Sequence, residues 1–250
     1  KHPCAMDQVI AVSTIAHTIQ LVMAPVFMVA GIAGLLNLLA LRLNRVVDRA
    51  RVLAQPDAAD AAVAAGQALG PLHGLPQAIK DTAAAKGIRS TFGSPLFASN
   101  VPTVDAIMAE RMRTAGAIFI GKTNVPEFGL GSHTYNPVFG ATGNAWNPAY
   151  SAGGSSGGTA VALALRMRAV AEGADMGGSL RNPAAFNNVL GFRPSQGRVP
   201  FWPRNETFLG QLVTEGPMGR SADDLALLLS VQSGYDPRAL LPLGTTVADW

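Results

Sequence analysis

The sequence predicts an α/β fold in which helices cover a sheet of short strands. Hydrophobic residues make up 48% of the 250 residues and charged residues 14%, which favours a large buried core and argues against disorder. From residue 57 onward, short apolar runs alternate with helix-favouring segments, the pattern of helices packed on a sheet. No internal repeat interrupts this alternation.

The first elements of this body are expected between residues 57 and 120. The alanine-rich stretch over 57–69 favours a helix. The apolar run over 75–79 predicts a strand. Two further elements follow: a helix over 104–114 with Thr103 as its cap, and a buried strand over 117–120.

The later elements continue the same alternation. The small-residue segment 157–168 predicts a helix, and 170–171 predicts a short strand before a glycine turn. Ser221 begins the sequence SADD, which is typical of a capping box, so a helix is expected from there to about Gln232.

The N-terminal segment has the composition of a membrane helix. Residues 8–41 contain no Asp, Glu, Lys or Arg, and 19–41 are long and apolar enough to cross a bilayer. The arginines that follow predict a cytoplasmic end. We therefore expect two domains, a membrane helix with its basic flank over 1–54 and the α/β body over 55–250. A buried core helix and a cleavable signal peptide are the alternatives.

Charge and cysteine content exclude several functions. The formal net charge of +3 sits in the first 51 residues, and the remainder carries 14 basic and 14 acidic groups, so no nucleic-acid partner is expected. The single cysteine, Cys4, excludes an intrachain disulfide and a cysteine-based zinc site. Because no histidine follows His133, the second half of the chain offers no histidine as a catalytic base.

Two glycine- and serine-rich clusters carry the predicted chemistry. They are SAGGSSGGT at 151–159 and DMGGSLRNP at 175–183. Glycine lets backbone N–H groups come close to a ligand, and consecutive N–H donors in such a turn can stabilise an oxyanion. A serine at the end of the turn is well placed as a nucleophile. A flexible linker is the alternative, and the apolar flanks of both clusters argue against it.

Two motif matches do not carry a function. Residues 153–157 satisfy G-x-S-x-G, but the nucleophile elbow of α/β-hydrolases needs an aspartate and a histidine after the serine. Residues 116–123 satisfy G-x-x-x-x-G-K-T, but a phosphate-binding loop would need a loop where the strand over 117–120 is expected. ATP binding is therefore not expected.

Lys80 is the remaining candidate for the base that activates a serine. It follows the apolar run over 75–79 and precedes Asp81. Burial favours the neutral form of lysine, and a pKa lowered by several units would make it a usable general base. An ordinary surface pair between Lys80 and Asp81 is the alternative, and the residues alone leave the two interpretations equal.

Taken together, these segments resemble the amidase signature family. The resemblance rests on GLPQAIKD at 74–81, the two glycine–serine clusters, GKTNVPEF at 121–128, GFRP at 191–194 and GPMGR at 216–220. It covers roughly residues 53–237. The fold that it implies is the family's mixed sheet covered by helices, incomplete at the C-terminus.

The resemblance implies an amide hydrolase with a Ser–cis-Ser–Lys triad. Ser179 is then the nucleophile that forms the acyl-enzyme, Lys80 is the neutral base, and Ser155, on a cis peptide bond, relays a proton between them. Two further groups of residues are implied: an oxyanion hole of the N–H groups of Met176, Gly177, Gly178 and Ser179, and support for the site from Ser156, Asp175 and Arg181. The family implies no metal or cofactor, and the substrate is a small-molecule amide.

Two positions bear on the choice between free-standing hydrolysis and amidotransfer. The tRNA amidotransferase members of the family usually have Thr after the Asp and Gln before the Pro, where this chain has Met176 and Asn182. We therefore expect free-standing amide hydrolysis rather than amidotransfer.

Three interpretations remain open. The preferred one is an amide hydrolase in the cytoplasm, anchored to the membrane through residues 8–41. The second is an inactive fragment, since family members are longer and the C-terminal half is missing. The third is a membrane protein fragment without a catalytic role, because residues 8–53 resemble a family of small, uncharacterised bacterial integral membrane proteins. The sequence fixes no oligomeric state.

Overall fold

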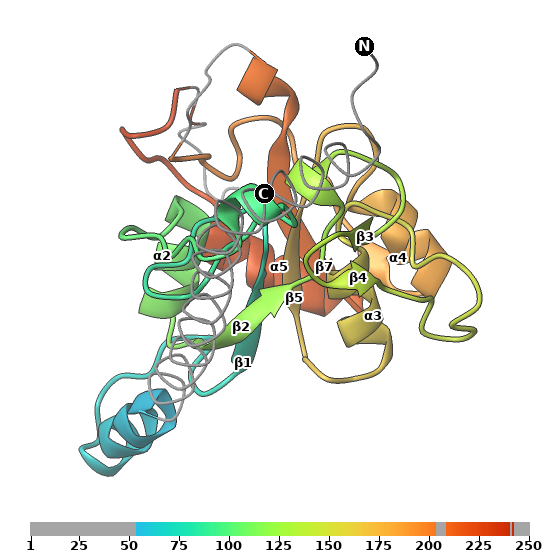
Figure 1. Ribbon diagram of the computed structural model, residues 1–250. Helices are drawn as coiled ribbons and strands as arrows, with labels where there is room; N and C mark the ends of the chain where they lie inside the picture. Colours follow the sequence, from blue (N-terminus) through green and yellow to red (C-terminus); the bar gives the residue numbers. More distant parts are fainter. Residues whose placement is uncertain (1–53, 204–208, 241, 243–250) are drawn as a thin grey trace, which may run out of the picture. The chain divides into compact units, whose positions relative to one another are not determined.

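The structure, a computed structural model, describes residues 54–203, 209–240 and 242, all within one compact unit (Figure 1). A helix covers residues 54–64, where the alanine-rich stretch predicts one. The elements that follow are, in chain order, β1 (Pro76–Lys80), η1 (Pro95–Phe97), α2 (Ile107–Thr114), β2 (Ile118–Thr123), η2 (Glu127–Gly129), β3 (Tyr135–Asn136), β4 (Gly140–Ala141), α3 (Gly157–Ala164), β5 (Ala171–Asp175), α4 (Arg181–Asn187), β6 (Leu190–Gly191), η3 (Leu209–Leu212), β7 (Thr214–Gly219) and α5 (Ala222–Gln232).

The main strands form a parallel pair and an antiparallel three-stranded sheet. β1 and β2 pair in parallel, with Lys80 opposite Thr123. β7 lies between β5 and β6 and is antiparallel to both. β1 packs beside β5, so the two sheets meet there (Figure 1). Strands of both directions interleaved with helices confirm the predicted α/β class.

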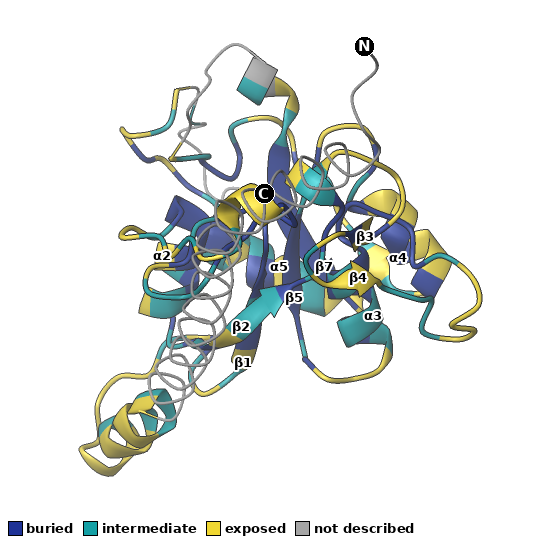
Figure 2. Ribbon diagram, viewed as in Figure 1, coloured by how far each residue is buried: buried dark blue, intermediate teal, exposed yellow. Residues whose placement is uncertain are grey.

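The helices pack in two groups, each over its own apolar core. α2 and α5 pack together, and the first core joins residues of β1, α2 and α5 such as Ile79, Met112 and Leu228. α3 packs against α4, β5 and β7, where Leu163 and Leu180 belong to the second core. Figure 2 shows the central strands buried between partly exposed helices. The strands where the two cores meet therefore lie inside the molecule.

The start and end of α5 confirm the prediction from the capping box. The Ser221 hydroxyl accepts a hydrogen bond from the Asp224 N–H (3.1 Å), and the Asp224 carboxylate accepts one from the Ser221 N–H (3.0 Å). The helix ends at Gln232. A local motif was enough here because both partners lie within one turn.

The predicted start of α2 is wrong. The helix begins at Ile107 rather than at residue 104, and Thr103 does not cap it. Instead, the Ala106 N–H donates to the Ala84 carbonyl (2.9 Å) and the Ile107 N–H to the Trp202 carbonyl (3.1 Å). Acceptors distant in the sequence thus satisfy N–H groups that a local cap would have satisfied.

Three further boundaries differ from the expectations. A helix is predicted over 157–168, but α3 ends at Ala164, four residues before the predicted end. The reason is that Arg166 takes the left-handed conformation with φ of 56°. β2 and β5 are longer than predicted and reach Thr123 and Asp175. β7 and α4 were not predicted at all, since the β7 sequence TEGPMG contains residues that are rare in strands.

The predicted membrane helix over 8–41 lies outside the described residues. Within the part of the chain that the structure describes, no helix combines the length and the apolar character needed to cross a bilayer. The division into domains 1–54 and 55–250 stays a prediction.

Candidate active site

Lys80 lies at the C-terminal end of β1, and only 2% of the residue is exposed. Its Nζ donates to the Ser155 hydroxyl (2.8 Å) and to the Ala174 carbonyl (3.0 Å). The Asp81 carboxylate accepts hydrogen bonds from the Thr91 N–H (3.0 Å) and the Thr91 hydroxyl (2.5 Å) instead. The amine of Lys80 therefore points to the first glycine–serine cluster, and the surface pair between Lys80 and Asp81 is not found.

Burial lowers the pKa of Lys80 from 10.5 to about 8, although the nearby carboxylates of Glu172, Asp175 and Glu215 raise it. About a tenth of such a lysine is neutral at pH 7, far more than of a lysine with the ordinary pKa. Lys80 can therefore act as a base near neutral pH. Burial also lowers the pKa of Lys122 to about 8, but its Nζ donates to the Ala83 carbonyl and not to a serine.

Ser155 lies in the loop before α3, and the Gly154–Ser155 peptide bond is cis. The Thr134 hydroxyl holds this loop, because it donates to the Gly153 carbonyl (2.8 Å) and accepts from the Gly157 N–H (3.2 Å). These contacts anchor the backbone on both sides of Ser155.

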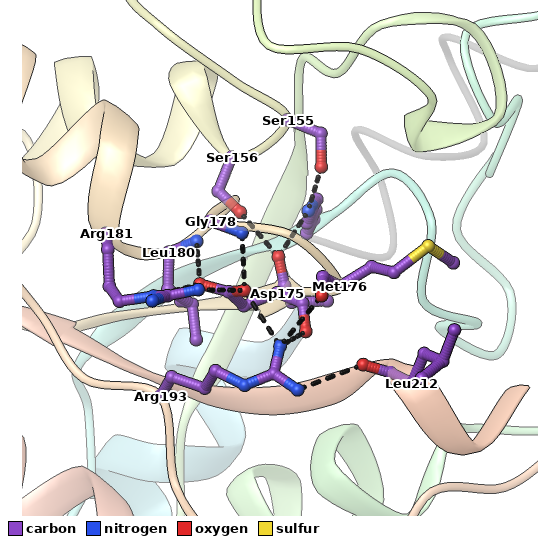
Figure 3. A network of polar contacts seen from close by, with 11 residues as sticks. Ser155, Ser156, Asp175, Met176, Gly178, Leu180, Arg181, Arg193 and Leu212 are labelled. Carbon is purple, nitrogen blue, oxygen red and sulfur yellow. Dashed lines mark hydrogen bonds and ion pairs between the residues drawn. The ribbon is translucent and has the colours of Figure 1, made fainter.

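Ser156, the next residue, is fully buried and belongs to the same network (Figure 3). Its hydroxyl donates to the Ala174 carbonyl (3.3 Å). The same carbonyl accepts the hydrogen bond from Lys80 Nζ. Ser156 and Lys80 are therefore joined through one acceptor on β5.

Asp175 is the centre of the second glycine–serine cluster (Figure 3). Its buried carboxylate accepts hydrogen bonds from the N–H groups of Gly178 (2.7 Å) and Leu180 (3.1 Å) and pairs with Arg181 (3.0 Å) and Arg193 (2.8 Å). Burial alone would raise the pKa of Asp175, but the hydrogen bonds from Arg181, Leu180, Gly178 and Arg193 outweigh it and hold the pKa far below its usual range. Asp175 is thus an ionised group that shapes the turn before Ser179.

Arg193 is a site residue that the sequence did not reveal. Besides the Asp175 carboxylate, its guanidinium donates to the carbonyls of Asp175, Met176 (3.2 Å) and Leu212 (3.1 Å). It lies in the GFRP segment at 191–194, which carried part of the family resemblance. Its partner Asp175 is 18 residues away along the chain, so no local spacing pointed to the contact.

Ser179 and the two other residues of the predicted triad line one pocket of about 230 Å³. Ser179 is half-buried, and Ser155 is 3% exposed. Among the described residues, the Ser155 hydroxyl is bonded to Lys80 Nζ, and no hydrogen bond joins it to the Ser179 hydroxyl. The structure therefore brings the three predicted residues together around a cavity, with a direct contact between two of them.

The structure changes the composition of the predicted oxyanion hole. The Gly178 N–H donates to Asp175 Oδ1 at 2.7 Å, so that donor holds the turn together and is not free for an oxyanion. The N–H groups of Met176, Gly177 and Ser179 make no hydrogen bond within the described part of the chain. Met176 and Ser179 line the pocket, and Gly177 between them is exposed, so three candidate donors remain.

An aromatic wall, which we define as Phe92, Phe97 and Phe128, lies on the other side of the pocket. Phe92 and Phe128 line the cavity, and Phe97 packs edge-on against both rings, with centroids 5.4 and 6.2 Å away. Phe92 and Phe128 have φ of 54° and 55°, a left-handed conformation that is rare for bulky residues. The Phe128 N–H donates to the Phe92 carbonyl (2.7 Å), and Asp81 holds Thr91, the neighbour of Phe92. Such locally strained backbone is common at binding sites.

The described residues contain no group of three or more His, Cys, Asp or Glu side chains arranged to hold a metal ion. The polar groups of the pocket are instead an amine, hydroxyls and the buried carboxylate of Glu215. This set is suited to proton transfer and nucleophilic attack.

The model of the amidase family matches residues 40–243 of the chain. Curated relatives include glutamyl-tRNA(Gln) amidotransferases, represented by their A subunits from Ralstonia nicotianae and Burkholderia thailandensis. Each is 46% identical over 192 residues, which are 77% of this chain and 38% of the relative. The chain therefore spans about two fifths of the length of the curated relatives.

Solved structures show the same likeness. A bacterial aryl acylamidase of the amidase signature enzymes superposes with a TM-score of 0.73 at 35% identity, covering 78% of this chain and 41% of that one. The corresponding glutamyl-tRNA(Gln) amidotransferase protein of Thermotoga maritima superposes with a TM-score of 0.65 at 32% identity, covering 72% and 40%. The fold and the sequence motifs thus lead to the same group of proteins.

Proposed function

The chain belongs to the amidase signature family, and from this membership and the geometry of the pocket we propose that it hydrolyses amide bonds through an acyl-enzyme on Ser179. The observation that carries the proposal is the 2.8 Å contact between Lys80 Nζ and the Ser155 hydroxyl, in a buried pocket that Ser179 also lines. A buried amine with a pKa of about 8 next to a serine is the chemical unit that this reaction needs.

Acylation begins with the neutral amine of Lys80. It takes the proton of the Ser155 hydroxyl, while Ser155 takes the proton of the Ser179 hydroxyl. Ser179 Oγ then forms a bond to the carbonyl carbon of the amide. The positive charge that results on Lys80 is stabilised by the Ala174 carbonyl, which accepts from Nζ at 3.0 Å, and by the surrounding carboxylates of Glu172, Asp175 and Glu215.

The negative charge develops on the carbonyl oxygen of the substrate. The N–H groups of Met176, Gly177 and Ser179 are our candidates for its donors. When the tetrahedral intermediate collapses, the C–N bond breaks and the proton held by Lys80 passes through Ser155 to the leaving amine. Water then attacks the acyl-enzyme, gives its proton to the same relay, and releases the carboxylic acid and free Ser179.

We further propose that the chain is a free-standing amide hydrolase and does not take part in amidotransfer. The residues that support this preference are Met176 and Asn182. The curated relatives belong to amidotransferases, whereas an aryl acylamidase is among the structural neighbours, so similarity alone does not separate the two. Turnover of a simple aryl amide by the chain without tRNA would support hydrolysis. Ammonia release from glutamine, with no turnover of aryl amides, would support a role in amidotransfer instead.

The test of the proposed function is covalent labelling with a fluorophosphonate probe, located by peptide mass spectrometry. The wild-type chain is expected to label at Ser179, and Lys80→Ala is expected to lose most of this labelling. Lys122→Ala is the matched control, because Lys122 has a similarly lowered pKa but does not contact the serines. Folded wild-type protein that does not label would favour the inactive fragment.

Attachment to the cytoplasmic face of a membrane is a separate proposal. It rests on the uncharged stretch over 8–41 and the arginines after it. After lysis without detergent, the chain is expected in the membrane pellet, and it should enter the supernatant only with detergent. Full recovery in the supernatant without detergent would contradict the anchor and leave the hydrolase proposal untouched.

A further inference from the structure

Within the described part of the chain, β1 is hydrogen-bonded to a neighbouring strand, β2, along one edge only. The Asp81 N–H donates to the Thr123 carbonyl of β2 at 3.1 Å, so the N–H of Lys80, the preceding residue, points to the other edge, toward β5. Among the described residues, no backbone hydrogen bond joins β1 to β5. A buried backbone N–H without an acceptor is costly, so this edge of β1 needs partners of another kind.

Two buried side chains supply these partners. Glu172 of β5 is 1% exposed and accepts the Lys80 N–H through Oε1. Arg168 is 3% exposed and donates from Nη1 to the Ala78 carbonyl at 2.6 Å. We call the contacts Glu172–Lys80 and Arg168–Ala78 the seam. These two side chains thus take the place of the backbone hydrogen bonds that a neighbouring strand would make.

One of the two seam contacts, Glu172–Lys80, holds the residue that carries the proposed chemistry. Glu172 holds the backbone of Lys80, and two residues further along β5 the Ala174 carbonyl holds its Nζ at 3.0 Å. Both ends of the lysine are therefore fixed by one strand, which leaves Nζ 2.8 Å from the Ser155 hydroxyl. We propose that Glu172 is a positioning residue, which keeps the end of β1 against β5 so that the amine of Lys80 reaches Ser155. This inference rests on the proposed function, in which Lys80 is the base.

Two substitutions of Glu172 distinguish the role of its acceptor oxygen from that of the rest of its side chain. Glu172→Gln keeps a carbonyl oxygen at the position of Oε1, and Glu172→Ala removes it. Glu172→Ala is expected to slow the labelling of Ser179 about 10- to 100-fold, since a small misplacement of a catalytic group has effects of this size. Glu172→Gln should stay within about threefold of wild type, because the neutral acceptor still bonds the Lys80 N–H. With an amide that the chain turns over, kcat should fall in Glu172→Ala while KM stays near its wild-type value.

Arg168→Met is the matched control for the stability of the seam. It removes the other seam contact and leaves the Glu172–Lys80 contact in place. We expect a lower melting temperature with labelling within about threefold of wild type. If Arg168→Met slows labelling as much as Glu172→Ala, or if Glu172→Gln is as slow as Glu172→Ala, Glu172 has no positioning role.

Hydrogen exchange at the Lys80 amide tests the same contact without any turnover. Faster exchange in Glu172→Ala and wild-type protection in Glu172→Gln would support the proposal. Unchanged protection in Glu172→Ala would overturn it. If the wild-type protein does not label at Ser179, only the proposed function is contradicted. The exchange result would still decide the role of Glu172. Should Glu172→Ala fail to fold, Glu172→Asp replaces it, since its shorter side chain draws the carboxylate away from the Lys80 N–H.

Discussion

Lys80 can activate a serine only when its amine is neutral. Burial lowers its pKa to about 8, and the surrounding carboxylates keep the pKa from falling further. The proton on Lys80 should therefore control the reactivity of Ser179 across the range in which most enzymes are assayed.

The first prediction follows from this pKa. Below pH 8, the rate of fluorophosphonate labelling at Ser179 should rise about tenfold per pH unit, because the neutral fraction of Lys80 rises by that factor. It should pass its midpoint at about pH 8 and then level off. Rates measured from about pH 5.5 to 10, corrected for hydrolysis of the probe, check this. Lys122→Ala should keep the same midpoint, and a flat profile would mean that Lys80 is not the base.

Asp175→Asn should destabilise the turn before Ser179. The carboxylate is fully buried and takes hydrogen bonds from Gly178, Leu180, Arg181 and Arg193. Asparagine keeps one acceptor oxygen but loses the charge and the second acceptor, so one of the hydrogen bonds that the buried carboxylate takes is lost, which should cost about 1–3 kcal/mol. Urea denaturation gives the change in the free energy of unfolding, and labelling at Ser179 should fall with it. An unchanged denaturation midpoint would show that water replaces the carboxylate.

At the scale of single residues, the sequence predicted the residues that share a motif. It did not predict those whose contacts join segments distant in the sequence. Lys80, Ser155 and Ser179 could be named from the glycine–serine clusters and the family resemblance. Arg193, Glu172 and the partners of Asp81 could not be named, because their contacts join segments that no local pattern relates. Gly178 is a different case, because its N–H bonds Asp175, only three residues before it, and the conformation of that turn decides the contact.

At the scale of elements, local signals succeeded where both partners lie within one turn. α5 begins at its capping box, whereas the start of α2 depends on the carbonyls of Ala84 and Trp202. β7 is buried at all six positions, but its glycines and its proline have low strand propensity, so its sequence does not predict a strand. The strand is a product of the sheet around it rather than of its own residues.

Ser221→Ala tests the capping box of α5. The substitution removes the acceptor of the Asp224 N–H and should lower the free energy of unfolding by about 1 kcal/mol. Ser230→Ala on the same helix is the control. Ser230 is exposed and bonds only the Leu227 carbonyl of its own helix, so its loss should change stability by less than about 0.5 kcal/mol. Equal effects of the two variants in urea denaturation would contradict the role of the cap.

At the scale of the whole described unit, the proposed site lies where the two cores meet. Lys80 comes from β1, which belongs with the first core, and Ser155 and Ser179 flank α3 and α4, which pack on the second. The sequence predicted the class of the fold but not this division, because the two cores are not continuous in the chain. The proposed chemistry would therefore require both cores to be folded at once.

A single unfolding transition is therefore expected for both cores. Met112→Ala in the first core and Leu163→Ala in the second should each cost about 2–5 kcal/mol and shift the same urea transition. The fluorescence of Trp146 and Trp202 should report it, and labelling at Ser179 should disappear at the same urea concentration. Two separate transitions would show that the cores fold independently.

Lys80 and Asp81 are consecutive, and their side chains serve opposite sides of β1. Lys80 reaches the serines, and Asp81 holds the loop that presents Phe92 to the pocket. Because side chains alternate along an extended strand, a shift of one residue would turn each of the two side chains to the opposite face. Substitutions within residues 76–79 can be absorbed by repacking, but a deletion of one residue there would place Asp81 at the position of Lys80, and an insertion would place Lys80 at the position of Asp81. Over evolutionary time, this segment should therefore keep its length more strictly than its composition.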